Sequence, residues 1–264
     1  MSTDPALRPF VAIDDVHYRY GDGPAIVDGV DLTVQRGEIH CLLGRSGCGK
    51  TTLLKLAAGL VLPDDGSVSI GGEALRQPGQ HISFVFQTPT LLDWLTVLDN
   101  VLLPITLKRR PGAGDRAAAA DLLERVGLSD YARHRPFELS GGQRSRVAVA
   151  RALIGDPVLL LLDEPFAALD ALTREDLQDD LLRLCTRTGM TVLFVTHDIA
   201  EAVYLGDKIS VMSAGRLIDT RDVALPRPRH RDMRYAPGFG ELCRQVREVM
   251  DVAAGPHASR RHAG

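Results

Sequence analysis

Apolar and polar residues follow two different periods along this chain. Residues 10–35 alternate between them and are interrupted by Gly, Asp and Pro, a pattern that predicts β-hairpins. Residues 38–43, 158–162 and 191–195 are short, almost continuous apolar runs, which are typical of strands buried on both faces of a parallel sheet. The chain is therefore expected to contain both hairpins and parallel strands.

Helical periodicity occurs between and after these strands. Ser140 opens one expected amphipathic helix, and Gly189 ends another. Asp115 is expected to cap a third helix over 116–126, after a flexible joint at 112–114. These segments alternate with the buried strands, as in an α/β protein.

The order of the elements predicts one domain with an inserted part. Residues 88–155 are expected to be mostly helical and to interrupt an α/β core formed by residues 10–87 and 156–225. Residues 226–264 form a C-terminal tail whose arginines make either a local basic patch or a solvated charged segment, and the second is favoured. No internal repeat is visible, so one such domain is expected.

A glycine-rich string after the first buried run carries the clearest chemistry. Residues 44–51 match the P-loop pattern, in which glycines let successive backbone N–H groups point at one anion. Lys50 adds a positive charge for the outer phosphates, and the Thr51 hydroxyl can bind Mg²⁺. The alternative is a glycine-rich turn without a ligand. The residues expected to bind the nucleotide phosphates are Gly44, Arg45, Ser46, Gly47, Cys48, Gly49, Lys50, Thr51 and Thr52.

Carboxylates and a histidine follow the other two buried runs. Asp163 and Glu164 come at the end of 158–162, where open α/β sheets bind ligands. Asp163 is a candidate Mg²⁺ ligand, and Glu164 a candidate base for an attacking water. His197 follows 191–195 and could position that water; alternatively it only packs, with Asp198 capping the next helix.

A second string of glycines opens the helix that begins at Ser140. Ser140 and Gln143 have the spacing of a capping box, and Gly141 and Gly142 lie between them. A hydroxyl and free N–H groups at a helix start can bind an anion, so this string predicts a second phosphate contact. The alternative is an ordinary glycine turn with a cap.

Composition limits the classes of protein that fit. The 264 residues carry a net charge of −3, so no broad nucleic-acid footprint is present. The four cysteines lie far apart, which indicates reduced thiols rather than a disulfide framework. The first residues lack a secretory signal pattern, and no apolar stretch approaches the ~20 residues that span a bilayer. A transport role would therefore require separate membrane subunits.

Taken together, the motifs resemble the ATP-binding cassette (ABC) ATPases over about residues 10–220. The resemblance implies a P-loop (RecA-like) α/β core, an antiparallel β subdomain and an inserted helical subdomain. It rests on the P-loop, Gln87, the Leu139–Gln143 string, Asp163 with Glu164, the turn at 168–170 and His197, in this order.

Further roles follow from the resemblance. Tyr20 looks like the aromatic residue that stacks on adenine; alternatively it is a surface tyrosine beside Tyr18. Gln87 looks like the glutamine that contacts Mg²⁺ and the attacking water. Asp170 looks like an aspartate at the dimer contact, although Ala167 departs from the Ser or Gly that is frequent in that turn.

The family also implies partners. Two copies, in the simplest case identical, would bind two ATP molecules head to tail, each between the P-loop of one copy and the Ser140 string of the other. Closure of this dimer would drive integral-membrane permease subunits, which receive solute from a binding protein. The expected location is the cytoplasmic face of the membrane, and no nucleic-acid partner is expected.

One subfamily resembles the chain more closely, namely the nitrate, sulfonate and taurine import ATPases. The resemblance lies in residues 91–101, 166–174 and 225–229, although Asp93 stands where a proline is usual, and importers of pyrimidine precursors share much of the pattern. Residues 91–101 correspond to the region that meets the permease. Trp94 in this segment is equally well interpreted as an interface anchor or as a residue packed inside the helical subdomain.

Two other classes of protein remain as alternatives. An ABC ATPase of DNA repair or translation would show long coiled coils or a second cassette, and neither is visible. A regulatory subunit that binds ATP without hydrolysing it would lack Glu164 or His197, and both are present.

Overall fold

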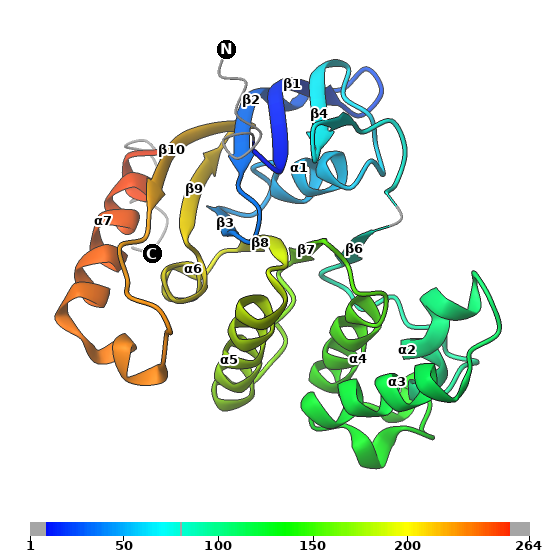
Figure 1. Cartoon of the computed structure of the whole chain (residues 1–264). Coiled ribbons are helices and arrows are strands. Elements are labelled where there is room, and N and C mark those ends of the chain that lie inside the picture. The colour runs from blue at the N-terminus through cyan, green and yellow to red at the C-terminus, as the bar shows by residue number, and fades with distance from the viewer. Residues whose placement is uncertain (1–8, 80, 254–264) are drawn as a thin grey trace, which may run out of the picture. The chain divides into compact units, whose positions relative to one another are not determined.

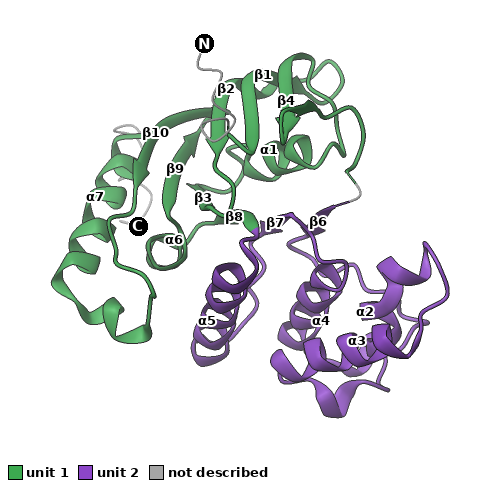
Figure 2. Ribbon diagram, viewed as in Figure 1, with its two compact units in different colours: residues 1–79, 191–264 green, residues 80–190 purple. Residues whose placement is uncertain are grey.

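The computed structural model describes residues 9–79 and 81–253 (Figure 1). These residues fall into two compact units (Figure 2). Unit 1 comprises the described residues of segments 1–79 and 191–264, and unit 2 comprises those of segment 80–190. The chain thus begins in unit 1, forms the whole of unit 2, and returns to unit 1.

The first part of unit 1 is an antiparallel sheet with the strand order β2-β1-β4-β5. Its first two strands form the hairpin expected from the alternating pattern of 10–35. Val11, Ile13 and Val16 of β1 are fully buried, and polar residues between them are exposed. The strands are β1 (Val11–Arg19), β2 (Ala25–Val34), β4 (Asp65–Ile70) and β5 (Glu73–Ala74).

Unit 1 also holds four strands in the order β10-β9-β3-β8. β3 runs parallel to both β8 and β9, and every residue of β3 and β8 is buried. Continuous apolar runs form these strands because both of their faces are covered. The strands are β3 (Ile39–Gly44), β8 (Thr191–Thr196), β9 (Lys208–Ser213) and β10 (Arg216–Asp222).

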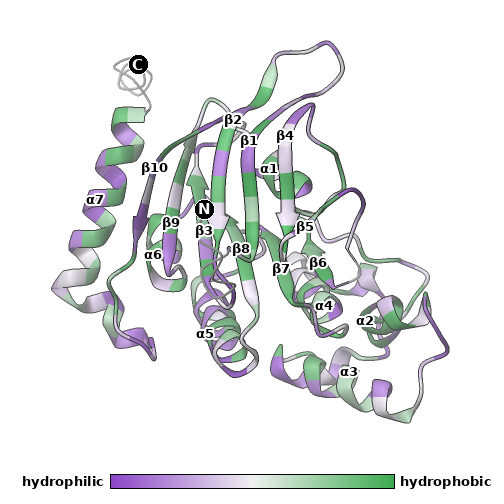
Figure 3. Cartoon of the chain, turned by 45° about the horizontal axis from the view of Figure 1, so that its top comes forward, coloured by the Kyte–Doolittle hydropathy of each residue, from purple (hydrophilic) through white to green (hydrophobic). Residues whose placement is uncertain are grey.

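Three α-helices and one 3₁₀ helix, η4, complete the described part of unit 1. They are α1 (Lys50–Ala57), α6 (Ile199–Leu205), η4 (Arg231–Tyr235) and α7 (Pro237–Ala253). Figure 3 shows α7 with polar and apolar residues alternating along its length. Among the helices that the structure describes, none is long and apolar enough to span a membrane.

Unit 2 combines two parallel strands with helices. β6 pairs with β7 in parallel, and α2 packs against both α3 and α4. The elements are β6 (Ile82–Val85), α2 (Val97–Thr106), α3 (Ala113–Arg125), η2 (Ser129–Tyr131), η3 (Pro136–Glu138), α4 (Gly141–Leu153), β7 (Leu159–Asp163) and α5 (Ala171–Thr188).

The two units confirm the predicted mixture of parallel strands, an antiparallel sheet and a helical segment. The helical segment expected over 88–155 lies within unit 2, which also contains β6, β7 and α5. The boundaries of the two compact units therefore differ from those of the predicted core and helical subdomain. The predicted boundaries stay a prediction.

The start of α3 differs from the prediction. The expected flexible joint at 112–114 is the helix start itself, with Gly112 as N-cap. Asp115 does not cap the helix from outside but lies in its first turn, where it accepts a hydrogen bond from the Gly112 N–H at 2.7 Å. Arg109 donates to the same carboxylate at 2.6 and 2.7 Å. The hydrogen bonds from Arg109 and then from Gly112 lower the pKa of Asp115 to about 2.

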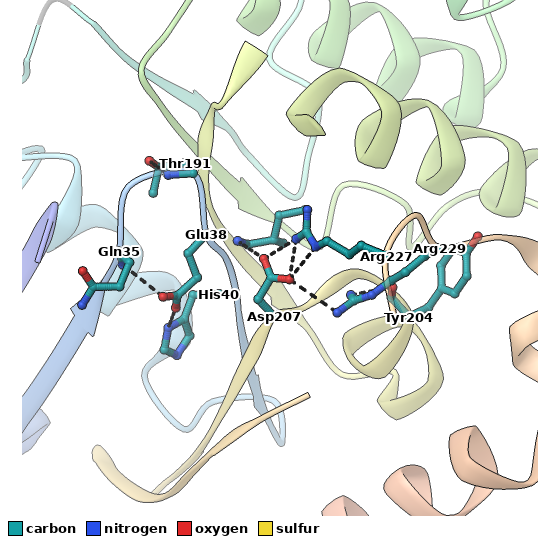
Figure 4. Close-up of polar contacts among 10 residues, drawn as sticks. Gln35, Glu38, His40, Thr191, Tyr204, Asp207, Arg227 and Arg229 are labelled. Atoms are coloured by element: carbon teal, nitrogen blue, oxygen red, sulfur yellow. Dashed lines mark hydrogen bonds and ion pairs between the residues drawn. The ribbon is translucent and has the colours of Figure 1, made fainter. Parts of the chain in front are cut away.

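The tail after β10 is not the solvated charged segment favoured from the sequence. Arg227 donates to the Asp207 carboxylate through Nε at 3.0 Å and through a second guanidinium nitrogen (Figure 4). Arg229 has a side chain only 1% exposed and donates to the Tyr204 carbonyl at 2.9 Å and to Asp207 at 3.4 Å. Asp207 also accepts the Ile39 N–H at 2.9 Å, so the tail is fixed to the start of β3.

A buried polar chain joins β3 to β9 and β10. His40 is fully buried, and its Nδ1 lies 2.9 Å from Glu38 Oε1 (Figure 4). Its Nε2 lies 2.8 Å from Ser210 Oγ. Ser210 Oγ lies 2.7 Å from Thr220 Oγ1, and Glu38 accepts the Gln35 N–H at 3.1 Å. Every member has a partner, so the chain can stabilise the strand that leads into the P-loop.

Replacing His40 should therefore destabilise unit 1. In His40→Phe, Glu38 and Ser210 lose a buried partner, and we expect the free energy of unfolding to fall by about 2–4 kcal/mol. The measurement is urea unfolding monitored by circular dichroism. His17→Phe is the control, because His17 is 37% exposed and pairs with Asp15 and Asp28 at the surface; its loss should stay below about 1 kcal/mol. Equal losses in the two variants would contradict a stabilising role for the buried chain.

Candidate functional site

The P-loop of unit 1 lies between β3 and α1, as predicted. Gly47 and Gly49 have φ of 80° and 108°, in the left-handed region that glycine adopts without strain. Lys50 is 5% exposed, and its Nζ donates to the carbonyl oxygens of Gly44 at 2.7 Å and Arg45 at 3.0 Å. The lysine charge is thus held beneath the loop, which curls around it.

The upper part of this loop faces solvent. The side chains of Arg45 and Ser46 are exposed, Cys48 is half-buried, and Thr51 is half-buried at the start of α1. Thr52 is buried and lies with its Oγ1 at 3.4 Å from the Tyr20 hydroxyl. An anion above the loop would therefore meet exposed backbone and the N-terminal end of α1, an arrangement that suits phosphate.

Tyr20 lies directly after β1 and is 48% exposed. The edge of its ring meets the ring of Tyr18, with centroids 5.0 Å apart and planes at 89°. The structure thus places Tyr20 beside Tyr18, as the interpretation of Tyr20 as a surface tyrosine predicts. The Tyr20 hydroxyl also lies beside Thr52 of α1. A half-exposed ring retains surface for stacking, so adenine contact stays a prediction.

His197 leaves the sheet at the same edge as the P-loop. β3 and β8 are parallel, and Leu43 is in register with Thr196, so the residues that follow each strand emerge side by side. His197 is exposed. Asp198 caps α6 by accepting the N–H groups of Ala200 at 2.8 Å and Glu201 at 3.2 Å, which confirms the predicted cap.

In unit 2, Gln87 and Glu164 also follow two parallel strands that pair with each other. β6 and β7 are parallel with Val85 opposite Leu162, so Gln87 and Glu164 each lie two residues beyond a registered pair. The Gln87 amide donates to Glu164 Oε2 at 3.4 Å. Asp163, at the end of β7, is 3% exposed. The structure thus brings Gln87 and Glu164 together beside a buried Asp163.

The backbone of Glu164 is unusual. Its φ of 46° lies in the left-handed region, which a residue with a side chain adopts at a cost of about 1–3 kcal/mol. Such conformations persist where the surrounding structure imposes them, and they gather at functional sites. Here the conformation directs the carboxylate toward Gln87 immediately after the buried strand.

The second glycine string forms the predicted capping box. The Gln143 side chain accepts the Ser140 N–H at 2.8 Å, and the Ser140 hydroxyl accepts the Gln143 N–H at 3.2 Å. The N–H groups of Gly141 and Gly142 have no acceptor among the residues that the structure describes. A Cβ on Gly142 would lie 2.8 Å from Leu169 Cδ2, so a side chain there would disturb the turn before α5. The helix start therefore offers two N–H groups to an external anion.

Asp170 has a local role in the structure. It is exposed and caps α5 by accepting the Thr173 N–H at 3.0 Å. This hydrogen bond lowers the pKa of Asp170. The predicted dimer contact of Asp170 stays a prediction, and any such contact would use a carboxylate that already holds a helix start.

Trp94 is 70% exposed, so the reading in which it packs inside the helical subdomain is wrong. Fully buried Asn100 holds the loop that carries it, by accepting the Leu92 N–H at 2.8 Å and donating to the carbonyl oxygens of Leu92 and Thr96 at 3.1 and 3.0 Å. Arg135 also donates to the Trp94 carbonyl oxygen. The loop is thus fixed from two sides and presents an indole to solvent.

The sequence reading missed Asn100 and Arg151 as positioning residues. Arg151 donates to the Thr90 carbonyl oxygen at 2.6 Å and to its hydroxyl at 3.1 Å, which fixes the segment directly after Gln87. One signal could have found Asn100, namely a lone amide among the apolar residues 97–106. A polar residue on an apolar helix face requires a buried partner.

Comparisons with known proteins agree with this geometry. A family model described as ABC transporter matches residues 27–167. The chain is 44% identical over 253 residues to the aliphatic sulfonates import ATP-binding protein SsuB 1 of Mesorhizobium japonicum, covering 94% of this chain and 92% of that protein. It is 42% identical over 238 residues to the bicarbonate transport ATP-binding protein CmpD of Synechocystis, covering 87% of this chain and 84% of that protein.

A solved structure is also similar. It is the dimeric structure of a post-hydrolysis state of the ATP-binding cassette MJ0796 bound to ADP and Pi, with a TM-score of 0.75 and 33% identity over 82% of this chain and 100% of that one. This similarity confirms the fold class expected from the motifs. No comparison tests the individual site residues, whose roles stay predictions.

The two P-loop glycines with left-handed backbone give a matched test of the cradle. A Cβ on Gly47 would meet open space, whereas one on Gly49 would lie 2.5 Å from the Ile26 carbonyl oxygen and 2.8 Å from Met212 Cε. We expect Gly47→Ala to cost about 1 kcal/mol from backbone strain alone. Gly49→Ala should cost about 3 kcal/mol or more, because the backbone must also move. Urea unfolding measures the loss of stability in both variants. Similar losses would show that Ile26 and Met212, which lie beneath Gly49, move to accommodate the added methyl group.

Proposed function

Because this chain belongs to the ABC transporter family and is an ATPase of that family, we propose that it powers an importer of small oxyanionic solutes. The observation that carries the proposal is similarity over nearly the whole chain to ATPases named for sulfonate and bicarbonate import, in a chain that forms a P-loop. Sulfonates, bicarbonate and nitrate are all small oxyanions. The solute itself would be selected by a binding protein and permease subunits.

Unit 1 supplies the groups that bind ATP in this proposal. The P-loop N–H groups and the α1 N-terminus bind the phosphates, and Lys50 exchanges its carbonyl partners for phosphate oxygens. Tyr20 stacks on adenine. His197 donates to the terminal phosphate from the strand edge that it shares with the P-loop.

Unit 2 supplies the base. Glu164 accepts a proton from the attacking water, and the Gln87 amide orients both the carboxylate and the water. The bond between the terminal phosphorus and its bridging oxygen breaks, and ADP and inorganic phosphate leave. Positioning and charge stabilisation supply most of the rate in such reactions.

Mg²⁺ fits the residues that the family implies for it. Thr51, Gln87 and Asp163 offer only oxygen ligands, which this ion prefers. Among the described residues, no group of three His, Cys, Asp or Glu side chains could hold a metal, and nucleotide-bound Mg²⁺ needs few protein ligands. When bound, the ion neutralises charge on the phosphate oxygens.

A second copy of the chain completes the proposal. The N–H groups of Gly141 and Gly142, with the Ser140 hydroxyl, would bind the terminal phosphate of the nucleotide in the partner subunit. Gln143 supports them by fixing the helix start, and Asp170 would contact the partner. Closure on ATP and opening after hydrolysis would then drive the permease.

Trp94 is the proposed anchor for the permease. A rigid loop that exposes a large aromatic ring has the character of an interface hot spot. Binding there would place the chain at the cytoplasmic face of the membrane as a peripheral subunit.

Glu164→Gln tests the catalytic assignment. The amide has nearly the same shape but cannot accept the proton, so we expect turnover to fall by at least about 100-fold while ATP affinity changes little. Phosphate release measures turnover, and titration with a fluorescent ATP analogue measures binding. Lys50→Ala is the control that should lose binding. Glu164→Gln with the parental rate would show that another group is the base.

Trp94→Ala tests the permease contact. If Trp94 becomes buried against the permease, its loss should weaken the complex between the two proteins by about 2 kcal/mol. The ATPase activity of the isolated subunit should stay unchanged. The measurement is co-purification with the co-expressed permease subunits from detergent-solubilised membranes. Leu107→Ala, at a side chain that is 79% exposed at the end of α2, is the matched control. Equal recovery of the permease with both variants would remove Trp94 from the interface.

A further inference from the structure

Helix α7 has a defined seat in unit 1. It contacts α6, β9 and η4, and Phe239 and Val246 on its inner face are buried. The Ser213 hydroxyl donates to the Ala253 carbonyl oxygen at 3.4 Å, which ties its last turn to β9. The segment before the helix is fixed to Asp207 by Arg227 and Arg229 (Figure 4). The helix is thus an integral part of the unit that carries the P-loop.

The last turns of α7 form one wall of a cavity that the P-loop shares. The cavity measures about 450 Å³, and Arg247 and Asp251 of α7 line it. Arg45 of the P-loop lines it from another side, together with His197 and Asp198 from the end of β8. A residue of the phosphate cradle and a residue of the C-terminal helix therefore face the same space.

Two arginines of this cavity have no partner for their side chains among the described residues. The guanidinium groups of Arg45 and Arg247 make no hydrogen bond or ion pair with any described residue. Arg244, one turn away on α7, instead pairs with Glu241 at 2.6 Å and with Glu248. Two guanidinium groups that line one cavity and have no protein partner can both donate to an anion bound there.

The two aspartates of the cavity differ in their hydrogen bonds to the protein. Asp198 accepts two N–H groups at the start of α6, which offset its charge. Asp251 makes no ion pair with a described residue and opposes an anion in the cavity. Arg247 and Asp198 also act on the neighbouring Cys243: burial first and then Asp198 raise the pKa of its thiol, while Arg247 lowers it.

We propose that this cavity binds inorganic phosphate between Arg45 and Arg247. The doubly charged oxyanion suits two guanidinium groups, each of which can donate to two oxygens. Arg45 belongs to both the P-loop and the cavity, so the cavity adjoins the loop from which phosphate would be released. The assignment of ATP as the source of this phosphate rests on the proposed function.

The experiment titrates phosphate into the full chain saturated with ADP, using calorimetry. Arg247→Ala should weaken phosphate binding about fivefold, through loss of one exposed charge-assisted contact. Asp251→Asn should tighten it about threefold, because an opposing charge is removed. Arg244→Ala on the outer face of α7 should change nothing, and ADP affinity should be equal in all variants. Opposite effects at Arg247 and Asp251 support a phosphate site rather than a structural role for the helix.

Several results would overturn the proposal. One is equal phosphate affinity in Arg247→Ala and Arg244→Ala, and another is unchanged or weaker binding in Asp251→Asn. Tighter binding of methanesulfonate or bicarbonate than of phosphate would assign the cavity to another oxyanion and reject phosphate. Absence of ATP hydrolysis by the parent chain would instead remove the proposed function, while the titration would still report on the cavity.

Discussion

The parallel pairing of β3 with β8 and β9 is the constraint on which the phosphate site depends. Because β3 is buried on both faces, it is stable only between two strands, and both neighbours hold it in a single register. This register makes the P-loop and His197 leave the sheet side by side. The same neighbours form the floor of the loop, since Met212 of β9 lies close to Gly44 and Gly49. The chemistry thus sits on a rigid edge.

Local patterns in the sequence predicted much of this arrangement. The alternating hairpin, the buried runs and the Ser140 capping box depend on residues near one another, and each forms as expected. The fold class and the family followed from ordered motifs. The prediction of a solvated tail was wrong because the partners of Arg229 lie more than twenty residues upstream, and no local pattern carries that information. Asn100 was missed for a similar reason, since its role depends on a loop that returns to it.

Several predicted site residues depart from local rules. Glu164 takes a backbone conformation that favours glycine, Lys50 keeps its charge almost buried, and Arg45 and Arg247 leave their guanidinium groups without protein partners. Other described arginines pair with carboxylates, as Arg109 does with Asp115. Natural sequences retain such inconsistencies mainly where a ligand compensates for them. In each unit, part of this cost therefore falls on residues that are predicted to bind or hydrolyse ATP.

The order of the strands also determines when each strand can pair during synthesis on the ribosome. Ile39 of β3 pairs with Val192, roughly 150 residues later, and the β9 partners come later still. The nascent chain must carry this largely apolar strand without either neighbour while unit 2 is being synthesised. Unit 2 is contiguous and can fold first, which leaves the nucleotide cradle as a late product of synthesis. A truncated polypeptide that ends before β8 would accordingly expose β3 and tend to aggregate.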